Sequence, residues 1–310
     1  MRVTIIANPA AGGGRAYGQI RRALERWDHP DWEPTLLPTR DRLHAGTLAL
    51  GLVDHPPDLL AVCGGDGTIN EVVSRLPAPP FPLAILPGGT ANVMARELGL
   101  PLDPVRALGV ALGLHIRRVD LGELRRGSER RFLFVAGIGF DASAVARARP
   151  RLKSVLGMGA YVVAAAEGLR RYGFPEFEVD SDAGVRRATS CLVCNARSYG
   201  GGLRVCPGAD MQDGLLDLLL IQGVHRAGLA LFLLQAWLGV AAERDWILRV
   251  RTRGARIEGP AAVPVEADGE LVGRLPLEIG LAPSILPLVV PGAPAALPGS
   301  RAARRGLRGH

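Results

Sequence analysis

Residues 59–73 combine the residue types that a phosphate-binding site needs. An apolar run of strand length leads into Gly-Gly-Asp-Gly-Thr at positions 64–68, and apolar residues then recur at helical spacing. Glycines let backbone N–H groups approach phosphate oxygens closely, and the dipole at a helix N-terminus favours negative charge. Asp66 would repel a bare phosphate, so its place in the loop implies a metal ion between them. Thr68 is expected to cap the helix. The alternative is an Asp-Gly turn between two core elements.

Two other glycine-rich loops follow apolar strands in the same way. Residues 8–15 read Asn-Pro-Ala-Ala-Gly-Gly-Gly-Arg after a strand at 2–7, and residues 87–92 read Pro-Gly-Gly-Thr-Ala-Asn after a strand at 82–86. In a parallel sheet such loops gather at the carboxyl ends of the strands, where ligands bind. Arg15 either reaches a phosphate from its loop or is a solvated residue in the first helical turn.

Two Asp-Gly pairs in the second half of the chain complete the candidate acidic residues. Asp213 precedes Gly214, and Asp268 precedes Gly269 and Glu270. The second pair stands between two expected strands, where Asp-Gly is a favoured two-residue hairpin turn. From residue types alone, the hairpin is therefore the better interpretation of Asp268.

Composition excludes several classes of protein. The chain has 310 residues, 48% apolar and 22% charged, with a net charge of +7 and a pI near 9.9, which fits a globular protein with an anionic partner. Its one lysine, Lys153, follows no glycine loop, so a Walker A nucleotide site is excluded.

The four cysteines indicate a reducing compartment. Cys191 and Cys194 have the spacing of a metal site, but they lie in an expected strand and the second ligand pair of a zinc site is missing. The longest apolar run, 227–242, is too short to span a bilayer.

The pattern of elements predicts two domains. Residues 1–122 alternate strands with helical segments, which is typical of an α/β domain with a parallel sheet. Residues 123–291 change to short strands, which favours a mainly antiparallel β-sandwich. A polar turn at 125–131 separates the two patterns, and the strand near 285–291 could return to the first domain. Helices are expected at 154–172 and 228–246, and residues 292–310 read as a disordered basic tail. The strands expected in the second domain are 132–136, 174–180, 185–195, 215–222, 247–257, 263–266 and 271–281.

Several separated motifs together resemble the diacylglycerol kinase and sphingosine kinase superfamily. They are the three glycine loops, Gly-x-Gly-Phe-Asp at 137–141, Asp-Gly-Leu-Leu-Asp at 213–217 and Asp-Gly-Glu at 268–270. NAD kinases share the motif at 64–68 but continue differently after their second glycine loop. Many family members have Asp where this chain has Val93, so the resemblance does not identify the lipid.

The resemblance implies a Rossmann-like, NAD kinase-like first domain and a β-sandwich second domain. It implies an ATP-dependent lipid kinase that transfers the γ-phosphoryl group to a lipid hydroxyl, with Mg²⁺ as cofactor. Asp268 would be the general base, with Asp66 as the alternative base. Asp66 would otherwise act through Mg²⁺, and Glu270 would orient Asp268 or a metal-bound water. A structural magnesium would lie at Asp213, Asp210 and Leu215. The nucleotide-binding residues would be Asn8, Arg15, Thr39, Gly64, Gly65, Gly67, Thr68, Gly89 and Thr90. For Thr39 the alternative is a helix cap.

The expected partners are ATP, a membrane lipid at the bilayer surface and a second copy of the chain in a homodimer, with no nucleic acid. We expect a cytoplasmic protein that associates peripherally and reversibly with membranes. Diacylglycerol, a sphingoid base, ceramide and phosphatidylglycerol all stay open as substrates. Two other functions also stay open: NAD kinase-like phosphorylation of a soluble alcohol, and a non-catalytic lipid- or nucleotide-binding regulator on the same fold.

Overall fold

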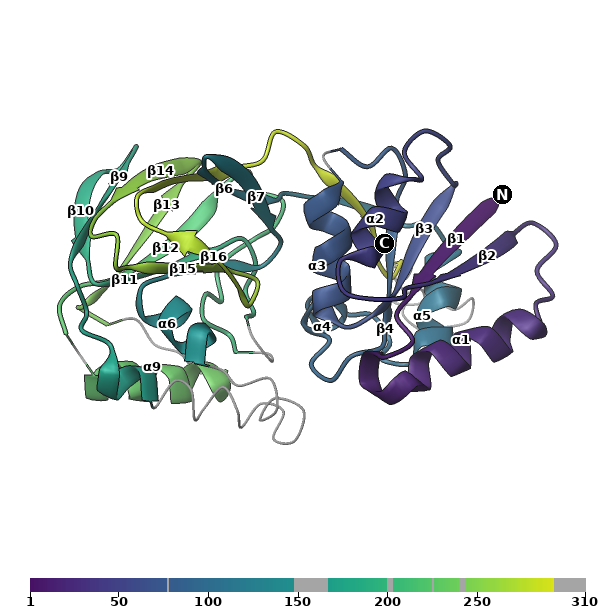
Figure 1. The fold of residues 1–310 in the computed structure, drawn as a ribbon, viewed down its shortest axis with the longest axis horizontal. Helices are drawn as coiled ribbons and strands as arrows, with labels where there is room; N and C mark the ends of the chain where they lie inside the picture. The colour runs from purple at the N-terminus through teal and green to yellow at the C-terminus, as the bar shows by residue number, and fades with distance from the viewer. Residues whose placement is uncertain (77, 148–166, 200–202, 225, 240–243, 293–310) are drawn as a thin grey trace, which may run out of the picture.

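The computed structural model describes residues 1–292 apart from 77, 148–166, 200–202, 225 and 240–243. Two lobes lie side by side, an α/β lobe that begins at the N-terminus and a β-rich lobe (Figure 1). The fold class expected from the sequence, a parallel α/β domain followed by an antiparallel sandwich, is confirmed.

The first domain is built on one six-stranded sheet, and each of the three glycine loops follows one of its parallel strands. The sheet order is β2-β1-β3-β4-β18-β5. β18 (Leu286–Val289) comes from the C-terminal end of the described chain and lies parallel to β4 and antiparallel to β5. The remaining strands are β1 (Arg2–Ala7), β2 (Glu33–Pro38), β3 (Leu59–Gly64), β4 (Leu83–Pro87) and β5 (Ile116–Val119).

Helices cover both faces of this sheet because its central strand is apolar on both sides. Every residue of β3 is buried, and alternate side chains join different clusters: Leu60 and Val62 pack with α3, whereas Leu59 and Ala61 pack with α1. Burying one such side chain stabilises the fold by about 1.5–3 kcal/mol. The helical elements are η1 (Ala11–Gly14), α1 (Arg15–Glu25), α2 (His44–Leu50), α3 (Asp66–Arg75), α4 (Val93–Glu97) and α5 (Pro104–Ala111).

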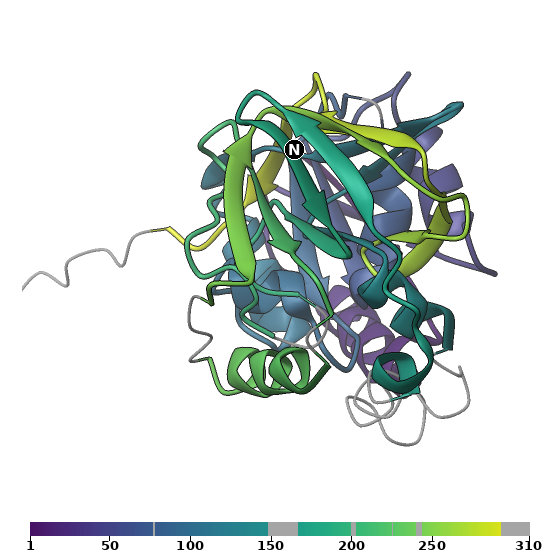
Figure 2. The same ribbon diagram turned by 90° about the vertical axis from the view of Figure 1, so that its left-hand side faces the viewer.

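The second domain consists of two antiparallel six-stranded sheets that enclose a common apolar cluster. One sheet has the order β10-β9-β14-β17-β6-β7 and the other β13-β12-β11-β8-β15-β16. Figure 2 shows these strands in front of the first domain, with α6 (Phe140–Arg147) and α9 (Arg226–Trp237) at one end of them. The strands are β6 (Gly122–Arg126), β7 (Ser128–Phe132), β8 (Val135–Ile138), β9 (Phe177–Ser181), β10 (Gly184–Ala188), β11 (Ser190–Cys194), β12 (Leu216–Ile221), β13 (Ile247–Thr252), β14 (Gly254–Glu258), β15 (Pro264–Ala267), β16 (Glu270–Arg274) and β17 (Leu277–Leu281).

Three long strands expected from the sequence are each two shorter strands. The ranges 185–195, 247–257 and 271–281 break at Thr189, at Arg253 and between Arg274 and Leu277, and each break moves the chain from one sheet to the other. The Thr189 hydroxyl donates to the carbonyls of Ile221 and Gly223 at its break. Because apolar residues continue through the corner, periodicity alone does not reveal it.

The expected polar turn at 125–131 is wrong, because these residues form the β6–β7 hairpin. Gly127, at a φ of +73°, makes its tight turn. Most of the helix expected at 154–172, and the tail from residue 293, lie outside the described residues.

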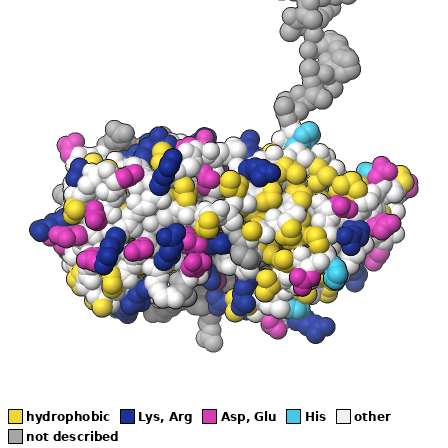
Figure 3. All heavy atoms as spheres, turned by 90° about the horizontal axis from the view of Figure 1, so that it is seen from above, with side chains coloured by type: hydrophobic (Ala, Val, Ile, Leu, Met, Phe, Trp, Pro, Cys, Tyr) yellow, Lys and Arg dark blue, Asp and Glu magenta, His cyan; other side chains and the backbone are white. Residues whose placement is uncertain are grey.

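The domains meet through hydrogen bonds and a shared apolar cluster. The N–H of Ala282 donates to the carbonyl of Leu121 at 2.8 Å, where the chain crosses between domains in opposite directions. One cluster contains Met94 of the first domain and Phe134 of the second. Figure 3 shows hydrophobic side chains gathered over the first domain on one face, whereas charged side chains are dispersed over the second.

Candidate active site

The three glycine loops pack against one another through their backbones. The N–H of Gly88 donates to the carbonyl of Gly64 at 2.8 Å. A β-carbon on Gly89 would lie 2.6 Å from Cα of Gly65, and one on Gly12 would collide with the carbonyl oxygen of Gly88. Side chains at these positions would therefore push the loops apart, so the glycines bring three strand ends together at one edge of the sheet.

Gly67 lies in the same motif but in different surroundings. It is exposed in the first turn of α3, and a β-carbon there would meet nothing within 4 Å. Its space opens outward from the N-terminus of a ten-residue helix, where backbone N–H groups are free to bind an anion. A ligand contact, rather than loop packing, would explain a glycine here.

Thr68 does not cap α3, contrary to the expectation. The helix begins at Asp66 and its N-cap residue is Gly65. Thr68 is buried, and its Oγ1 accepts a hydrogen bond from Nδ2 of Asn8 at 3.1 Å. The hydroxyl thus connects the first loop to the second.

Asp66 stands at the start of α3 and connects to α4, the helix that follows the third loop. Its Oδ1 accepts a hydrogen bond from the N–H of Met94 at 3.2 Å. Asn92, at a φ of +48°, accepts from the N–H of Gly89 at 2.8 Å and donates to the carbonyl of Gly89 at 2.9 Å. Asn92 therefore holds the third loop in shape, a role that sequence reasoning did not assign.

The other nucleotide-binding candidates lie at the same edge of the sheet. Thr39 is buried directly after β2, and its N–H donates to the carbonyl of Ala7 at 2.8 Å. It is not a helix cap, because α2 begins only after Leu43. Arg15 and Thr90 are exposed, one after the first loop and one within the third.

Asp268 occupies a two-residue hairpin turn between β15 and β16. Ala267 pairs with Glu270 across the turn, and both turn residues have positive φ, +48° for Asp268 and +84° for Gly269. This is the type I′ geometry that favours Asp-Gly and Asn-Gly. The hairpin expected from the residue types is therefore present.

The Asp268 carboxylate is held by three backbone N–H groups. Leu133 donates to Oδ2 at 2.7 Å, while Phe134 and Val135 donate to Oδ1 at 2.9 and 3.2 Å. Burial nevertheless raises the pKa of Asp268 to about 6, and these hydrogen bonds limit the rise. The carboxyl group therefore titrates close to neutral pH, where a general base works best.

Glu270 forms ion pairs with one arginine of each domain. Its Oε2 lies 2.5 Å from Nη2 of Arg130 on β7, and its Oε1 lies 3.0 Å from Nη2 of Arg42, which follows β2 in the first domain. The sequence contains no signal for either arginine, because exposed arginines are abundant in this chain. Glu270 therefore connects the Asp268 hairpin to the first domain.

Asp66 and Asp268 come from different domains, and no described hydrogen bond joins them. Their supporting elements do meet: α3 packs on β7, and Nη1 of Arg131 donates to the carbonyl of Leu76 at 2.8 Å. The N–H groups that hold Asp268 directly follow β7. The structure thus places the hairpin turn next to β7, the strand that packs on α3.

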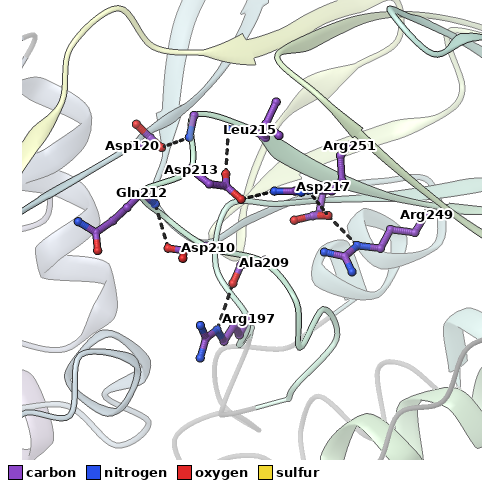
Figure 4. Close-up of polar contacts among 11 residues, drawn as sticks. Asp120, Arg197, Ala209, Asp210, Gln212, Asp213, Leu215, Asp217, Arg249 and Arg251 are labelled. Carbon is purple, nitrogen blue, oxygen red and sulfur yellow. Dashed lines mark hydrogen bonds and ion pairs between the residues drawn. The ribbon is translucent and has the colours of Figure 1, made fainter.

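Asp213 and its neighbours form a hydrogen-bonded loop (Figure 4). Asp213 accepts from the N–H of Leu215 at 3.0 Å and pairs with Arg251. Asp120, which sequence reasoning missed, accepts from the N–H of Gly214 at 2.9 Å. Its pKa is raised mainly by burial, and the charges of Asp213 and Asp210 add to the rise.

The acidic loop is not arranged as a metal site in this structure. Within the part of the chain that the structure describes, no group of three His, Cys, Asp or Glu side chains is placed to hold a metal ion. Asp213 would have to release Arg251 to bind one. The structural magnesium at Asp213, Asp210 and Leu215 stays a prediction.

Comparison with known families matches both domains. Residues 2–124 match the diacylglycerol kinase catalytic domain, and residues 135–290 match the YegS C-terminal NAD kinase beta sandwich-like domain. A diacylglycerol kinase from Mycobacterium tuberculosis is 32% identical over 297 residues, covering 94% of this chain and 95% of the relative. One from Staphylococcus aureus is 26% identical over 280 residues, covering 89% and 88%.

Solved structures share the fold. A diacylglycerol kinase from Bacillus anthracis superposes with a TM-score of 0.75 at 24% identity, covering 93% of this chain and 96% of that one. An NAD kinase from Archaeoglobus fulgidus in complex with ATP gives 0.53 at 14%, covering 94% of both. Fold and sequence together define a lipid kinase, a phosphotransferase that acts on a lipid alcohol. The chain belongs to the diacylglycerol kinase-like family of lipid kinases.

Proposed function

We propose that this enzyme transfers the γ-phosphoryl group of ATP to the hydroxyl group of diacylglycerol or a closely related membrane lipid. The observation that carries the proposal is the position of Asp268, an acid of near-neutral pKa that the β-sandwich presents beside the element packed on the phosphate-loop helix. The relatives' names support diacylglycerol, and the ATP bound by the NAD kinase neighbour supports the donor.

The glycine loops would bind the triphosphate through backbone N–H groups. The N-terminus of α3 adds a partial positive charge, and the exposed surface at Gly67 leaves room for phosphate oxygens. Asp66 has one carboxylate oxygen engaged by Met94, and its other oxygen suits a hard cation. Mg²⁺ held there would neutralise charge on the phosphates during transfer.

Asp268 would accept the proton of the lipid hydroxyl. A carboxylate has about four lone-pair positions, and the three backbone N–H donors leave one for the substrate. The N–H groups fix its direction, and a positioned base contributes about 10²–10⁴ in rate. Glu270 would keep the hairpin in register with the nucleotide domain through Arg42.

Membrane contact is part of the proposal because the substrate is a lipid. The chain carries a net charge of +7, and α9 exposes Leu231 and Leu234, with 45% and 51% of their surfaces accessible. Among the described residues, no helix is long and apolar enough to cross a membrane. Binding to anionic vesicles should therefore be reversible and should weaken as salt rises.

The deciding experiment supplies the enzyme and Mg²⁺ with γ-labelled ATP and separate acceptors. Mixed vesicles containing diacylglycerol, a sphingoid base, ceramide or phosphatidylglycerol are compared with NAD and with water alone. Label in phosphatidic acid supports the proposal. Label in NADP would instead show a soluble-alcohol kinase, and ATP binding without label in any acceptor would show a regulator.

A further inference from the structure

Two acidic side chains that the proposed chemistry does not use are packed together behind the Asp268 turn. Glu266, on β15, has no exposed surface, and Asp141 comes from the first turn of α6. Both carboxyl groups crowd the α-carbon of Gly137, where a β-carbon would collide with an oxygen of each. The hydroxyl of Tyr199 donates to Oδ2 of Asp141 at 3.0 Å.

Among the residues that the structure describes, no cation balances the charge of the two groups. Within the described part of the chain, neither acid has an ion-pair partner, and Oε1 of Glu266 has no hydrogen-bond donor when both are written as carboxylates. Two adjacent carboxylates in an apolar interior cannot both be ionised at ordinary pH. A proton on Oε1 removes the conflict, because Glu266 then donates to Asp141, with which it is in hydrogen-bonding contact.

The other titratable groups that face the pair add no positive charge to it. Tyr199 and the Asp268 carboxyl are its titratable neighbours, from the segment after β11 and from the β15–β16 turn. Burial raises the pKa of Glu266 well above its usual range, and the nearby Asp141 charge raises it further. Burial also raises the pKa of Asp141, but its hydrogen bonds to Glu266 and Tyr199 oppose the rise. Glu266 is therefore the protonated member.

The second oxygen of Glu266 connects the pair to the proposed base. Oε2 accepts the N–H of Gly269 at 2.6 Å, within the two-residue turn that carries Asp268. We propose that Glu266 and Asp141 share a single proton and that the neutral Glu266 is a positioning residue, which fixes the Asp268–Gly269 turn. This role rests on Asp268 being the base. A neutral Glu266 contacts the turn without adding its own negative charge beside Asp268, and the one charge that the pair retains is on Asp141.

The protonation state can be tested without substrate. Because the pKa of Glu266 is raised on folding, its protonated form stabilises the protein below the unfolded-state value, and this stability is lost as pH rises through the folded-state value. Glu266→Gln cannot ionise and escapes that loss. Its Tm relative to wild type should therefore rise between about pH 5 and 8. The matched control is Glu258→Gln, at an exposed side chain on β14, whose Tm difference from wild type should stay flat across this pH range.

A direct readout is the infrared C=O stretch of a protonated carboxylic acid at pH 7. It should be present in wild type and in Glu258→Gln and reduced in Glu266→Gln. An unchanged band, or a Tm difference for Glu266→Gln as flat as that of the control, would overturn the shared proton whatever the enzyme phosphorylates.

The positioning role is tested by kinetics with two substitutions. Glutamine keeps an oxygen for Gly269 and an N–H for Asp141, so Glu266→Gln should stay within about threefold of wild type in kcat, whereas Glu266→Ala should lose about tenfold or more. The KM for ATP should be unchanged in both. Equal kcat values for the two variants would overturn the positioning role. Loss of the Asp268 assignment would be seen separately, as full activity in Asp268→Asn.

Discussion

The glycine-loop edge of the first domain is built from closely packed backbone, whereas the hairpin end of the second domain is built around acidic side chains. At the first, Gly64, Gly65, Gly88 and Gly89 bring strand ends so close together that side chains are excluded. At the second, three acidic side chains lie close together, and two of them, Asp268 and Glu266, are held by backbone N–H groups. The first region offers polar backbone to an anion, whereas the second holds acidic groups whose charge depends on burial.

This difference sets what each substitution can reveal. The close approach of the glycine loops depends on the absence of side chains, so a glycine-to-alanine substitution tests whether there is room for a β-carbon. Acidic groups depend on protonation, so an isosteric amide reports on charge while the shape is kept. Probes of both kinds can be matched to controls within the same motif or the same kind of turn.

The largest effect is expected for Asp268→Asn. Asparagine suits a type I′ turn, so the hairpin should form, but the base is removed and kcat should fall by about 10²–10⁴. The amide also turns an N–H toward the N–H of Leu133, which should cost about 1–3 kcal/mol of stability. Steady-state kinetics and urea unfolding measure the two effects.

The matched control for that variant is Asp182→Asn in the exposed turn between β9 and β10. It should leave kcat and stability unchanged. If kcat of Asp268→Asn stays within a few-fold of wild type, Asp268 is not the general base and serves only to form the hairpin turn.

The loop side is probed by Gly89→Ala against Gly67→Ala. The first places Cβ 2.6 Å from Cα of Gly65, so the loops must separate, and both Tm and ATP affinity should fall. The second meets open space in a helix, where alanine is favoured by up to about 1 kcal/mol, so Tm should hold or rise.

ATP binding by calorimetry with Mg²⁺ separates the two explanations of Gly67. If phosphate oxygens approach the exposed turn of α3, Gly67→Ala should weaken ATP binding by about tenfold despite its higher Tm. If ATP affinity is unchanged in Gly67→Ala, the phosphates do not bind at this turn, and the glycine has no explanation in ligand binding.

A moderate effect is expected from pH. Asp268 must be ionised to accept a proton, and its pKa is raised to about 6, so kcat/KM should fall as pH drops below that value. The fall should approach tenfold per pH unit. Initial rates between pH 5 and 8 test this, and the same step should be missing from the residual activity of Asp268→Asn.

The smallest effect is expected at the contact between the two regions. Arg42 is 77% exposed, so its ion pair with Glu270 should contribute at most about 1 kcal/mol. Arg42→Ala should lower kcat only a few-fold, and added salt should reduce the difference from wild type. Arg40→Ala, two residues away, is the matched control. A loss of 10²-fold or more in Arg42→Ala would give this arginine a direct role on the substrate.

The sequence predicted the first region better than the second. The glycine loops are contiguous motifs, and the strand–loop–helix pattern around each one indicates both its fold and its place at the sheet edge. The details that failed there were local, since Thr68 is buried against Asn8 instead of capping α3.

The second region depends on contacts between distant residues. The N–H groups at 133–135 that hold Asp268 and the pairing of Glu266 with Asp141 have no local signature. The chain also changes sheets at Thr189 and Arg253 while its apolar pattern continues. Sequence periodicity reports burial, but it does not report which sheet buries the residue.

The position of β18 between β4 and β5 makes the second domain an insertion within the first. A fragment that ends at residue 122 would lack a strand in the interior of its sheet, leaving β4 with an unpaired edge that invites aggregation. Because Leu121 and Ala282 are already hydrogen-bonded to each other, deleting residues 122–281 and joining these two positions would restore a continuous chain. Excision would thus leave the sheet of the first domain complete, whereas truncation would remove one of its interior strands.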